Sequence, residues 1–378
     1  MERFNNWFVV CLSLYLMVIG CKEEKNIKKD VEKNKISMEK PIMTPLIVQK
    51  PDSIQTPEGM VWISGGEFIQ GAVTQDEMAM DHEKPGIKVA VNGFFMDATE
   101  VTNAQFSAFV EETGYVTVAE RPIDWEEIKK QLPEGAQKPH DSILQPGALT
   151  FKKAKEALPN LYDFSQWWKW KIGADWKHPN GPDSSIKGQG NYPVVQVAYE
   201  DALAYCDWAG RRLPTEAEWE LAARGGKYGT TFFWGDDIAF LPEKANTWEG
   251  TFPLTNTIAD GYELRAPVKS YEPNEYGLYD MAGNVWEWTN DWYNTNYYKE
   301  QGAQNAVQRN PSGAVSPYTS NNPYAKEKVI KGGSFLCSDS YCASYRVSAR
   351  MGSSMDSALE HTGFRTVATV AMLKKQNQ

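Results

Sequence analysis

The chain has 378 residues, a hydrophobic fraction of 42% and a formal net charge of −10. Such a length suits one large domain or two modest ones, with enough apolar residues for a core. The acidic balance argues against nucleic acid as a partner, because binding a phosphate backbone needs an excess of Lys and Arg; it does suit divalent cations.

Residues 1–20 are expected to be a signal peptide. Arg3 gives a weakly basic start, and the apolar stretch from Trp7 to Gly20 is too short to span a bilayer comfortably. The next residues, VIGC, resemble the lipobox of a bacterial lipoprotein, which implies cleavage before Cys21 and lipid attachment to its thiol. An ordinary secretory signal with an incidental cysteine is the alternative. Both place the protein outside the cytoplasm.

Residues 21–57 are polar, rich in Lys and Glu, and contain scattered Pro. This composition predicts a disordered tether between membrane and domain. From Met60 onward the sequence shows no internal linker and no repeat of fixed period. We therefore expect one domain over residues 58–372 and a short tail over 373–378.

Three short segments are predicted to contain strands: GMVWISGGEFIQG (59–71), YPVVQVAY (192–199) and KVIKGGSF (328–335). Two capping boxes predict helices, each ended by a glycine. The capping pairs are Thr102 with Gln105 and Thr215 with Glu218, and the glycines are Gly114 and Gly225. A third helix is expected before Gly210, with Cys206 on its core face as a small buried thiol.

The rest of the chain is rich in Gly, Pro, Asn and Trp, which are residues of turns and irregular packing. This mixture predicts an α+β fold with little regular secondary structure, not a doubly wound sheet or a β-sandwich. Irregular backbone needs partners other than sheet ladders, and bound metal ions are one solution.

Common catalytic signatures are missing from the sequence. The four His residues are never within ten residues of one another, and neither H-E-x-x-H nor C-x-x-C occurs, so a zinc site of the usual spacing is not expected. There is also no Walker loop, G-x-S-x-G elbow or dinucleotide-binding fingerprint.

Two segments offer oxygen ligands of the kind that Ca²⁺ prefers. In YDMAGNVWEWTNDW, the carbonyls of Gly283 and Val285 and the carboxylate of Glu287 can face one side of an extended segment, near Asp280. In ANTWEGTFPLTNTIADGY, Asn246 and Asp260 offer side-chain oxygens across a loop. Polar turns whose Asn and Asp satisfy their own backbone are the alternative in both cases.

Cys337 and Cys342 lie five residues apart in GGSFLCSDSYCASYR. A chain that folds back here would bring the two sulfurs together. A small-loop disulfide, a Cu(I) site with two thiolate ligands and a redox-active thiol pair are all compatible with this spacing.

The order of the motifs is more specific than any one of them. GMVWISGGEFIQG, DATEVTNAQFSAFVEETGY, RRLPTEAEWELAARGG, GLYDMAGNVWEWTNDW, KGGSFLCSDSYCASYRVSAR and HTGFR together resemble the formylglycine-generating enzyme (sulfatase-modifying factor) family over about residues 58–370. WWKWKIGADWKHPNGPDSSI resembles the form that this segment takes in the true enzymes of the family.

The resemblance implies a single compact domain related to the C-type lectin fold and stabilised by calcium. It implies a copper-dependent oxidase that uses O₂ to convert the cysteine of a C-x-P-x-R motif, in unfolded sulfatase polypeptides, to Cα-formylglycine. A monomer is expected, held at the periplasmic face of the inner or outer membrane by its lipid alone. The alternative is a non-catalytic lipoprotein of the same fold, used as a surface-binding or gliding-motility scaffold.

The resemblance also assigns residues. Cys337 and Cys342 match the catalytic cysteines that hold Cu(I), and Ser334 and Trp286 match residues that line the oxygen pocket. The matched calcium positions are Asn246, Thr247, Asp260 and Tyr262 for one site and Asp280, Gly283, Val285 and Glu287 for the other, with Glu100 as a further acidic ligand.

Four positions depart from the family pattern. Thr366 and Val347 stand where animal members have cysteines of structural disulfides, which leaves Cys206 without a partner. Ser338 stands where His often follows the first active cysteine, and Asp280 stands where Asn is common. Asp is at least as good an oxygen ligand for calcium, so only the disulfides and the substrate contacts are put in doubt.

Overall fold

Short strands in four small sheets support the fold in a computed structural model that describes residues 45–130, 134–320 and 322–376. The chain from Leu46 onward forms one compact unit. The predicted signal peptide, Cys21 and most of the predicted tether lie outside the described residues. Residues 46–57, expected in the tether, contact this unit: the N–H of Gly65 bonds to the carbonyl of Val48, and Ile54 is buried.

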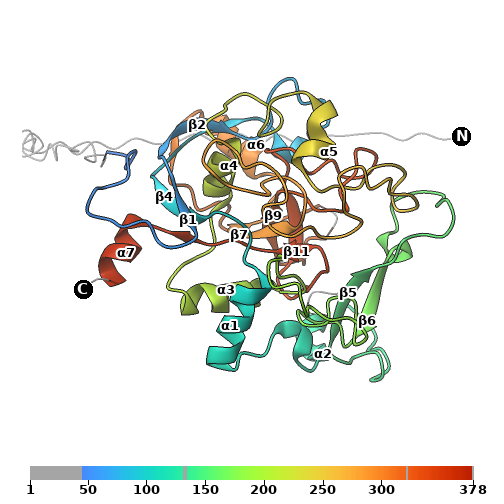
Figure 1. The fold of residues 1–378 in the computed structure, drawn as a ribbon. Helices are drawn as coiled ribbons and strands as arrows, with labels where there is room; N and C mark the ends of the chain where they lie inside the picture. The colour runs from blue at the N-terminus through green and yellow to red at the C-terminus, as the bar shows by residue number, and fades with distance from the viewer. Residues whose placement is uncertain (1–44, 131–133, 321, 377–378) are drawn as a thin grey trace, which may run out of the picture. The chain divides into compact units, whose positions relative to one another are not determined.

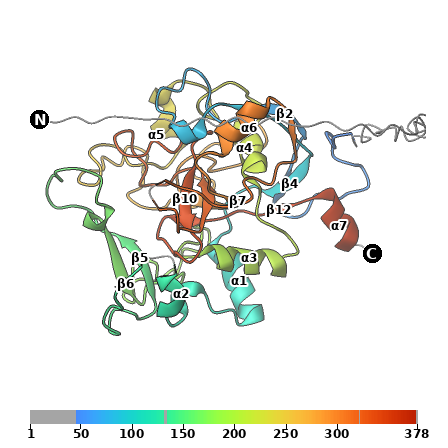
Figure 2. The same ribbon diagram turned by 180° about the vertical axis from the view of Figure 1, so that it is seen from behind.

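The central sheet has the strand order β10–β9–β7–β11 (Figures 1 and 2). Its strands are β10 (Met351–Ser354), β9 (Glu327–Lys331), β7 (Trp286–Trp292) and β11 (Thr362–Gly363). All neighbours are antiparallel except β11 and β7, which are parallel. This sheet matters most for function, because the loop between β9 and β10 carries both candidate cysteines.

Two further sheets of three strands each complete the body of the unit. They comprise β1 (Met60–Ile63), β4 (Phe94–Asp97) and β12 (Val367–Ala368), and β2 (Gly66–Gln70), β3 (Ile87–Val91) and β8 (Gln308–Arg309). The fourth sheet is a hairpin of β5 (Gly147–Phe151) and β6 (Trp168–Ile172), which projects at one side (Figures 1 and 2). Most of β6 is exposed.

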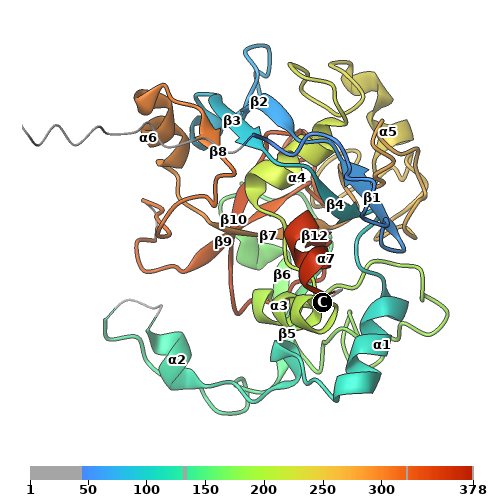
Figure 3. The same cartoon turned by 90° about the vertical axis from the view of Figure 1, so that its left-hand side faces the viewer.

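The helices pack around these sheets. They are α1 (Asn103–Thr113), α2 (Trp125–Lys129), α3 (Tyr199–Trp208), α4 (Glu216–Arg224), α5 (Leu241–Lys244), α6 (Tyr297–Gln304) and α7 (Val370–Gln376), with 3₁₀ turns at Asp81–Glu83, Val118–Glu120, Phe164–Gln166 and Ile238–Phe240. Helices α1 and α3 contact each other (Figure 3), and α4 packs on β7 and β9. Over the described ranges, the structure contains no helix whose length and apolar character would let it cross a membrane.

The predicted helix boundaries are confirmed. Thr102 caps α1 and Thr215 caps α4, each through a complete capping box. Gly114 and Gly225 end these helices with φ of 66° and 57°, the left-handed conformation that glycine adopts without a steric penalty.

Of the three predicted strand segments, two are confirmed and one is wrong. Segment 59–71 forms β1 and β2, and segment 328–335 contributes to β9. YPVVQVAY forms no strand beyond a single bridge between Pro193 and Thr102. Pro193 has no N–H for a ladder, and Gln196 has a φ of 57°, so the segment cannot continue as a strand. Its buried Val residues fill the core without entering a sheet.

Aromatic side chains fill much of the core around the candidate site. Trp219, Trp286 and Trp288 are buried in the main cluster, which includes the two cysteines of the β9–β10 loop. A separate cluster joins Trp167, beside the hairpin, to Trp248, Phe252, Phe335 and Leu336. The site lies between these two clusters.

Candidate active site

The two cysteines are brought together by a tight turn after β9. The backbone carbonyl of Ser338 accepts hydrogen bonds from the N–H groups of Tyr341, Cys342 and Ala343, at 3.2, 3.1 and 2.8 Å. Gly333 makes the close approach possible, because a Cβ there would lie 2.8 Å from a backbone carbon of Ser344. The chain therefore folds back and places Cys342 beside Cys337.

Both cysteines are free thiols and both are buried, at 1% and 8% exposure. Their sulfurs share a hydrogen bond. Burial raises the pKa of Cys337 well above its ordinary value, and the bond to Cys342 raises it further. Burial also raises the pKa of Cys342, but hydrogen bonds from Cys337, Ser344 and Ser338 outweigh it and the net shift is downward. The pair is therefore asymmetric.

Ser334 and Trp286 lie where the resemblance placed them, on the wall of the cavity that holds the thiols. The N–H of Ser334 points to the sulfur of Cys337 at 3.4 Å. Trp286 is the first residue of β7, and its N–H bonds to the carbonyl of His361 at 2.8 Å. All four predicted catalytic residues thus lie around one space.

This cavity has a volume of about 270 Å³ and is walled mainly by aromatic and apolar side chains. Besides the four predicted residues, it is lined by Leu149, Phe164, Trp167, Trp168, Phe252, Ile330, Leu336, Tyr341, residues 351–354, Ser357, Leu359 and His361. The central sheet contributes strands β7, β9 and β10 to it, and the hairpin contributes residues of β5 and β6.

Sequence reasoning missed His361 and the hairpin as parts of the site, although His361 and strand β6 lie in segments that carried the resemblance. The His361 ring packs on Trp168 with centroids 4.8 Å apart, and its Nδ1 lies 3.1 Å from the hydroxyl of Thr362. Burial lowers the pKa of His361 to about 3, so the imidazole is neutral at physiological pH. It can position a partner by hydrogen bonding without adding charge.

A second hollow of about 670 Å³ adjoins the cysteine cavity and shares Leu149, Ser354 and Ser357 with it. Apolar residues such as Trp170 and Met355 line part of it. Its acidic lining residues are Asp124, Glu200, Glu327 and Asp356, against the single cation Arg121. The thiols therefore open onto a larger, mostly apolar and acidic surface.

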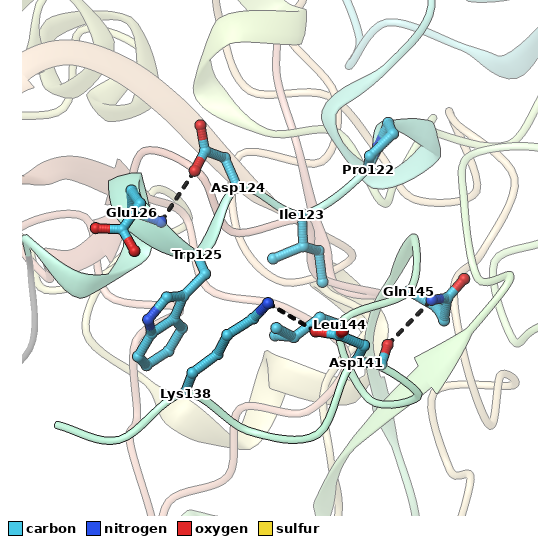
Figure 4. Close-up of a pocket in the computed structure, with 9 residues that line it drawn as sticks. All are labelled: Pro122, Ile123, Asp124, Trp125, Glu126, Lys138, Asp141, Leu144 and Gln145. Atoms are coloured by element: carbon cyan, nitrogen blue, oxygen red, sulfur yellow. Dashed lines mark hydrogen bonds and ion pairs between the residues drawn. The ribbon is translucent and has the colours of Figure 1, made fainter.

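A third hollow, near α2, lies farther from the chemistry (Figure 4). It shares Pro122, Ile123 and Asp124 with the second hollow, and it contains an ion pair between Lys138 and Asp141 at 2.7 Å. Its volume is about 690 Å³, but neither a thiol nor any predicted site residue lines it. Size alone does not identify the functional site here.

The first predicted calcium set is brought together in one loop. Asp260 accepts hydrogen bonds from the N–H groups of Thr247, at 2.8 Å, and Tyr262, at 3.0 Å. Among the described residues, nothing bonds to the buried Oδ1 of Asn246. Burial raises the pKa of Asp260 to about 6. A carboxylate bonded to the backbone of Thr247 and an unpartnered amide oxygen on the preceding residue, Asn246, fit a hard cation.

The second set is only partly assembled as predicted. Asp280 and Glu100 are neighbouring buried acids, and each has a buried oxygen with no partner in the described part of the chain. Burial raises the pKa of Asp280 to about 6, and burial followed by the charge of Asp280 raises that of Glu100. A cation bound beside Asp280 and Glu100 would therefore stabilise their ionised forms.

Glu287, by contrast, faces a protein cation. Its two oxygens accept from Arg365 at 2.6 and 2.7 Å, and one also accepts from the indole of Trp219 at 2.7 Å. These bonds use three of about four acceptor positions of a carboxylate. Within the described residues, no group of three or more His, Cys, Asp or Glu side chains is arranged to hold a metal.

The departures from the family pattern occupy buried positions. Thr366 bonds through both its N–H and its hydroxyl to Asp97, at 2.8 and 2.6 Å. Cys206 is a free thiol on α3, and burial raises its pKa. Ser338 bonds to the hydroxyl of Ser340 at 2.7 Å inside the cysteine turn. These contacts are structural ones.

The chain was compared with known proteins. A family model described as "Sulfatase-modifying factor enzyme 1-like domain" matches residues 46–370. The formylglycine-generating enzyme of Mus musculus is 42% identical over 311 residues, which cover 82% of this chain and 74% of the relative. The formylglycine-generating enzyme of Thermomonospora curvata is 42% identical over 316 residues, covering 82% and 93%.

Among solved structures, PvdO from Pseudomonas aeruginosa superimposes with a TM-score of 0.55 at 22% identity. The match covers 85% of this chain and 100% of that chain. At this identity the likeness concerns the fold alone.

Proposed function

Because this chain belongs to the sulfatase-modifying factor family, we propose that it is a formylglycine-generating enzyme, which oxidises a cysteine of sulfatase polypeptides to Cα-formylglycine. The observation that carries the proposal is the thiol pair: Cys337 and Cys342 are both free, buried and hydrogen-bonded to each other in an aromatic cavity. A scaffold protein has no physical need for such a pair.

The shape of the site supports an unfolded substrate. A cavity of about 270 Å³ can take one side chain and its backbone, not the surface of a folded protein. Glu327 of the adjoining hollow would complement the arginine of a C-x-P-x-R motif, whereas Glu200 there already pairs with Arg121 at 2.6 Å. Trp167, Trp168 and Phe252 would exclude water around the substrate cysteine.

The thiol pair also fits Cu(I). Two sulfur ligands with no carboxylate lining the cavity favour a soft, low-coordinate ion over Ca²⁺ or Mg²⁺. Cys337 and Cys342 would hold the ion through their sulfurs, and the bound metal would supply electron transfer to O₂. Ser334 keeps the Cys337 sulfur in place through its N–H, and Trp286 forms an apolar wall for the oxygen.

The chemistry needs a reductant as well as O₂. Converting a –CH₂–SH group to an aldehyde with release of H₂S removes two electrons from carbon. Reduction of O₂ to two oxygen atoms at the oxidation level of water takes four. The other two electrons and two protons must come from an external donor, so an assay has to contain a thiol reductant.

We also propose two calcium ions and a relation to the C-type lectin fold. Asn246 and Asp260, with the carbonyls of Thr247 and Tyr262, would hold one ion. Asp280 and Glu100, with the carbonyls of Gly283 and Val285, would hold the other. The unpartnered buried oxygens of Asn246, Asp280 and Glu100 support both sites. Glu287 would contribute only its remaining acceptor position, because Arg365 and Trp219 take the others.

For its location, we propose an exported monomeric lipoprotein anchored through Cys21 at the periplasmic face of the inner or outer membrane. The lipobox-like VIGC segment supports this proposal. Exported sulfatase chains would be met there before they fold, in a compartment that contains O₂.

The decisive experiment is turnover of a peptide. Purified protein loaded with Cu(I) and supplied with dithiothreitol in air should convert a Leu-Cys-Thr-Pro-Ser-Arg peptide to its formylglycine form, detected by mass spectrometry. Cys337→Ser and Cys342→Ser should each abolish conversion, while Cys206→Ser, a buried thiol outside the cavity, should keep it. Absence of conversion by the loaded wild type would overturn the enzymatic function.

A further inference from the structure

The turn that presents Cys342 has a strained end. Ala343, the next residue, has a φ of 45°, a left-handed conformation that disfavours residues with a Cβ. Its N–H closes the turn onto the carbonyl of Ser338 at 2.8 Å. A residue in this conformation persists only when its surroundings hold it there.

Arg346 holds Ala343 in place. The Nε of this buried arginine donates to the carbonyl oxygen of Ala343 at 2.9 Å. The rest of the guanidinium bonds to two carboxylates from the N-terminal part of the unit: Nη1 to Asp76 at 2.7 Å, and Nη1 and Nη2 to the two oxygens of Glu83, both at 2.8 Å. The hydroxyl of Ser348 donates to Glu83 as well, at 2.8 Å.

This arrangement ties the cysteine loop to a segment more than 260 residues earlier in the sequence. The fork-to-fork pairing of an arginine with a carboxylate fixes both direction and distance. All three charged groups are buried, at 4% exposure or less, so the pairing is not weakened by water or salt. The two carboxylates hold the guanidinium in place, and its Nε fixes the position of the Ala343 carbonyl through a hydrogen bond.

A second arginine clamp lies four residues later in the same β9–β10 loop, but none of its hydrogen bonds reaches the turn at residues 338–343. Arg350 is buried and pairs with the two oxygens of Glu216 at 2.7 and 3.0 Å. Its remaining nitrogen donates to the carbonyl of Asn294 at 3.0 Å and, at the longer distance of 3.5 Å, to that of His82, which precedes Glu83. Both clamps pair a buried arginine with both oxygens of a buried glutamate, so the Arg350 clamp serves as a control for the Arg346 clamp, although only Arg346 binds a second carboxylate.

We propose that Arg346 is a positioning residue for the thiol pair: held by Glu83 and Asp76, it fixes the Ala343 carbonyl and thereby keeps Cys342 beside Cys337 in the cavity that both line. A contribution of this positioning to turnover rests on the proposed function. The positioning itself concerns only the distance and orientation of two sulfurs, and can be measured without substrate.

The substrate-free readout is the effective concentration of the two thiols, obtained from the equilibrium between the Cys337–Cys342 disulfide and glutathione, with the pair mapped by mass spectrometry. The variants are Arg346→Lys and Glu83→Gln, with Arg350→Lys and Glu216→Gln as matched controls. All are measured in the full protein at a temperature at which circular dichroism shows each to be folded. The peptide kcat/KM is measured alongside.

Arg346→Lys and Glu83→Gln should lower both the effective concentration and kcat/KM at least about tenfold, because small displacements of reacting groups have effects of this size. The controls should stay within about twofold, since they disturb an equally buried pair that makes no hydrogen bond to the turn at residues 338–343. If Arg346→Lys does not fold, Asp76→Asn, which removes a single bond of the clamp, should give a smaller decrease of the same sign.

A rescue separates positioning from general stability. Glycine adopts a φ of 45° without strain, so Ala343→Gly should restore part of the effective concentration in the Arg346→Lys background and change nothing in the Arg350→Lys background. The proposal fails if clamp and control variants fall equally, if neither falls, or if glycine restores nothing. The wild type could fail to convert the peptide while the effective concentrations of the thiols still differ between clamp and control variants as expected. That result would support the positioning role of Arg346 and contradict the proposed function.

Discussion

Cys337 and Cys342 line the same cavity, but the pKa values of their thiols are shifted in opposite directions. Hydrogen bonds from Cys337, Ser344 and Ser338 overcome the effect of burial and lower the pKa of Cys342, whereas burial raises that of Cys337. Because the thiolate is the reactive form, Cys342 should be alkylated first by iodoacetamide in the metal-free protein. Peptide mapping by mass spectrometry over a time course measures the order.

The hydrogen bond between the two sulfurs provides the control for this prediction. Cys337→Ala removes the donor to Cys342, so alkylation of Cys342 should become slower in that variant. Earlier labelling of Cys337 in the wild type would contradict the asymmetry.

Asp291 gives a prediction for pH. Burial, followed by the negative charge of Glu216, raises the pKa of Asp291 to about 7, above the unfolded value of about 3.9. The folded state therefore binds the proton more tightly, and the contribution of Asp291 to stability is present below about pH 4 and lost as the pH rises through about 7. Between pH 5 and pH 8 this loss is about 3 kcal/mol.

Asp291→Asn cannot ionise and keeps an oxygen for the N–H of Glu216, which the carboxylate accepts at 2.9 Å. Urea unfolding at the two pH values should show that the variant loses less stability than the wild type on going to pH 8. Asp207→Asn, on the exposed side of α3, should leave the wild-type difference unchanged. An identical pH dependence for Asp291→Asn would show that another group is responsible.

At the scale of elements, the sequence was informative where a local signal decides the conformation. Capping residues and terminal glycines marked α1 and α4 correctly, because their hydrogen bonds are made within a few residues. The segment YPVVQVAY was wrongly predicted to be a strand. Its apolar residues are buried in the core, but Pro193 and Gln196 prevent the hydrogen-bonded ladder of a strand. The hairpin was not predicted either, since β6 is mostly exposed and lacks the buried alternation of an ordinary strand.

The two calcium loops can be tested as elements. In the metal-free domain, burial raises the pKa of both Asp280 and Glu100, and the charge of Asp280 raises that of Glu100 further, so a bound cation would make their ionisation less costly. Adding calcium at 100 times its Kd should stabilise the domain by about 2.7 kcal/mol per site, seen as a rise in Tm that EDTA reverses.

The double variant Glu100→Gln with Asp280→Asn should lose the part of this rise that comes from the second site. It should also melt no lower than the metal-free wild type, because it replaces two buried acids with neutral amides. A Tm that does not respond to EDTA in the wild type would exclude both sites.

At the scale of the whole molecule, the site is built from distant segments. Trp168, Trp286, Cys337 and His361 line one cavity although nearly 200 residues separate the first from the last. Spacing within the sequence could relate Cys337 to Cys342, but only the assembled fold brings the hairpin and His361 to them. The family resemblance supplied Ser334 and Trp286 without geometry, and the neutral state of His361 follows from burial alone.

The membrane anchor is the last whole-molecule property to test. A linker of roughly 25 residues between a lipid on Cys21 and the compact unit has an r.m.s. span of about 25–30 Å if it is flexible. That reach would hold the cysteine cavity clear of the membrane while keeping it near newly exported chains.

The full chain expressed in a Gram-negative host should therefore sediment with membranes, and its mature N-terminal peptide should carry acyl chains on Cys21 by mass spectrometry. Cys21→Ser cannot be acylated, so it should either stay unprocessed or appear in the soluble periplasm with its peptide activity intact. A soluble wild-type protein with an unmodified Cys21 would show that residues 1–20 are an ordinary secretory signal.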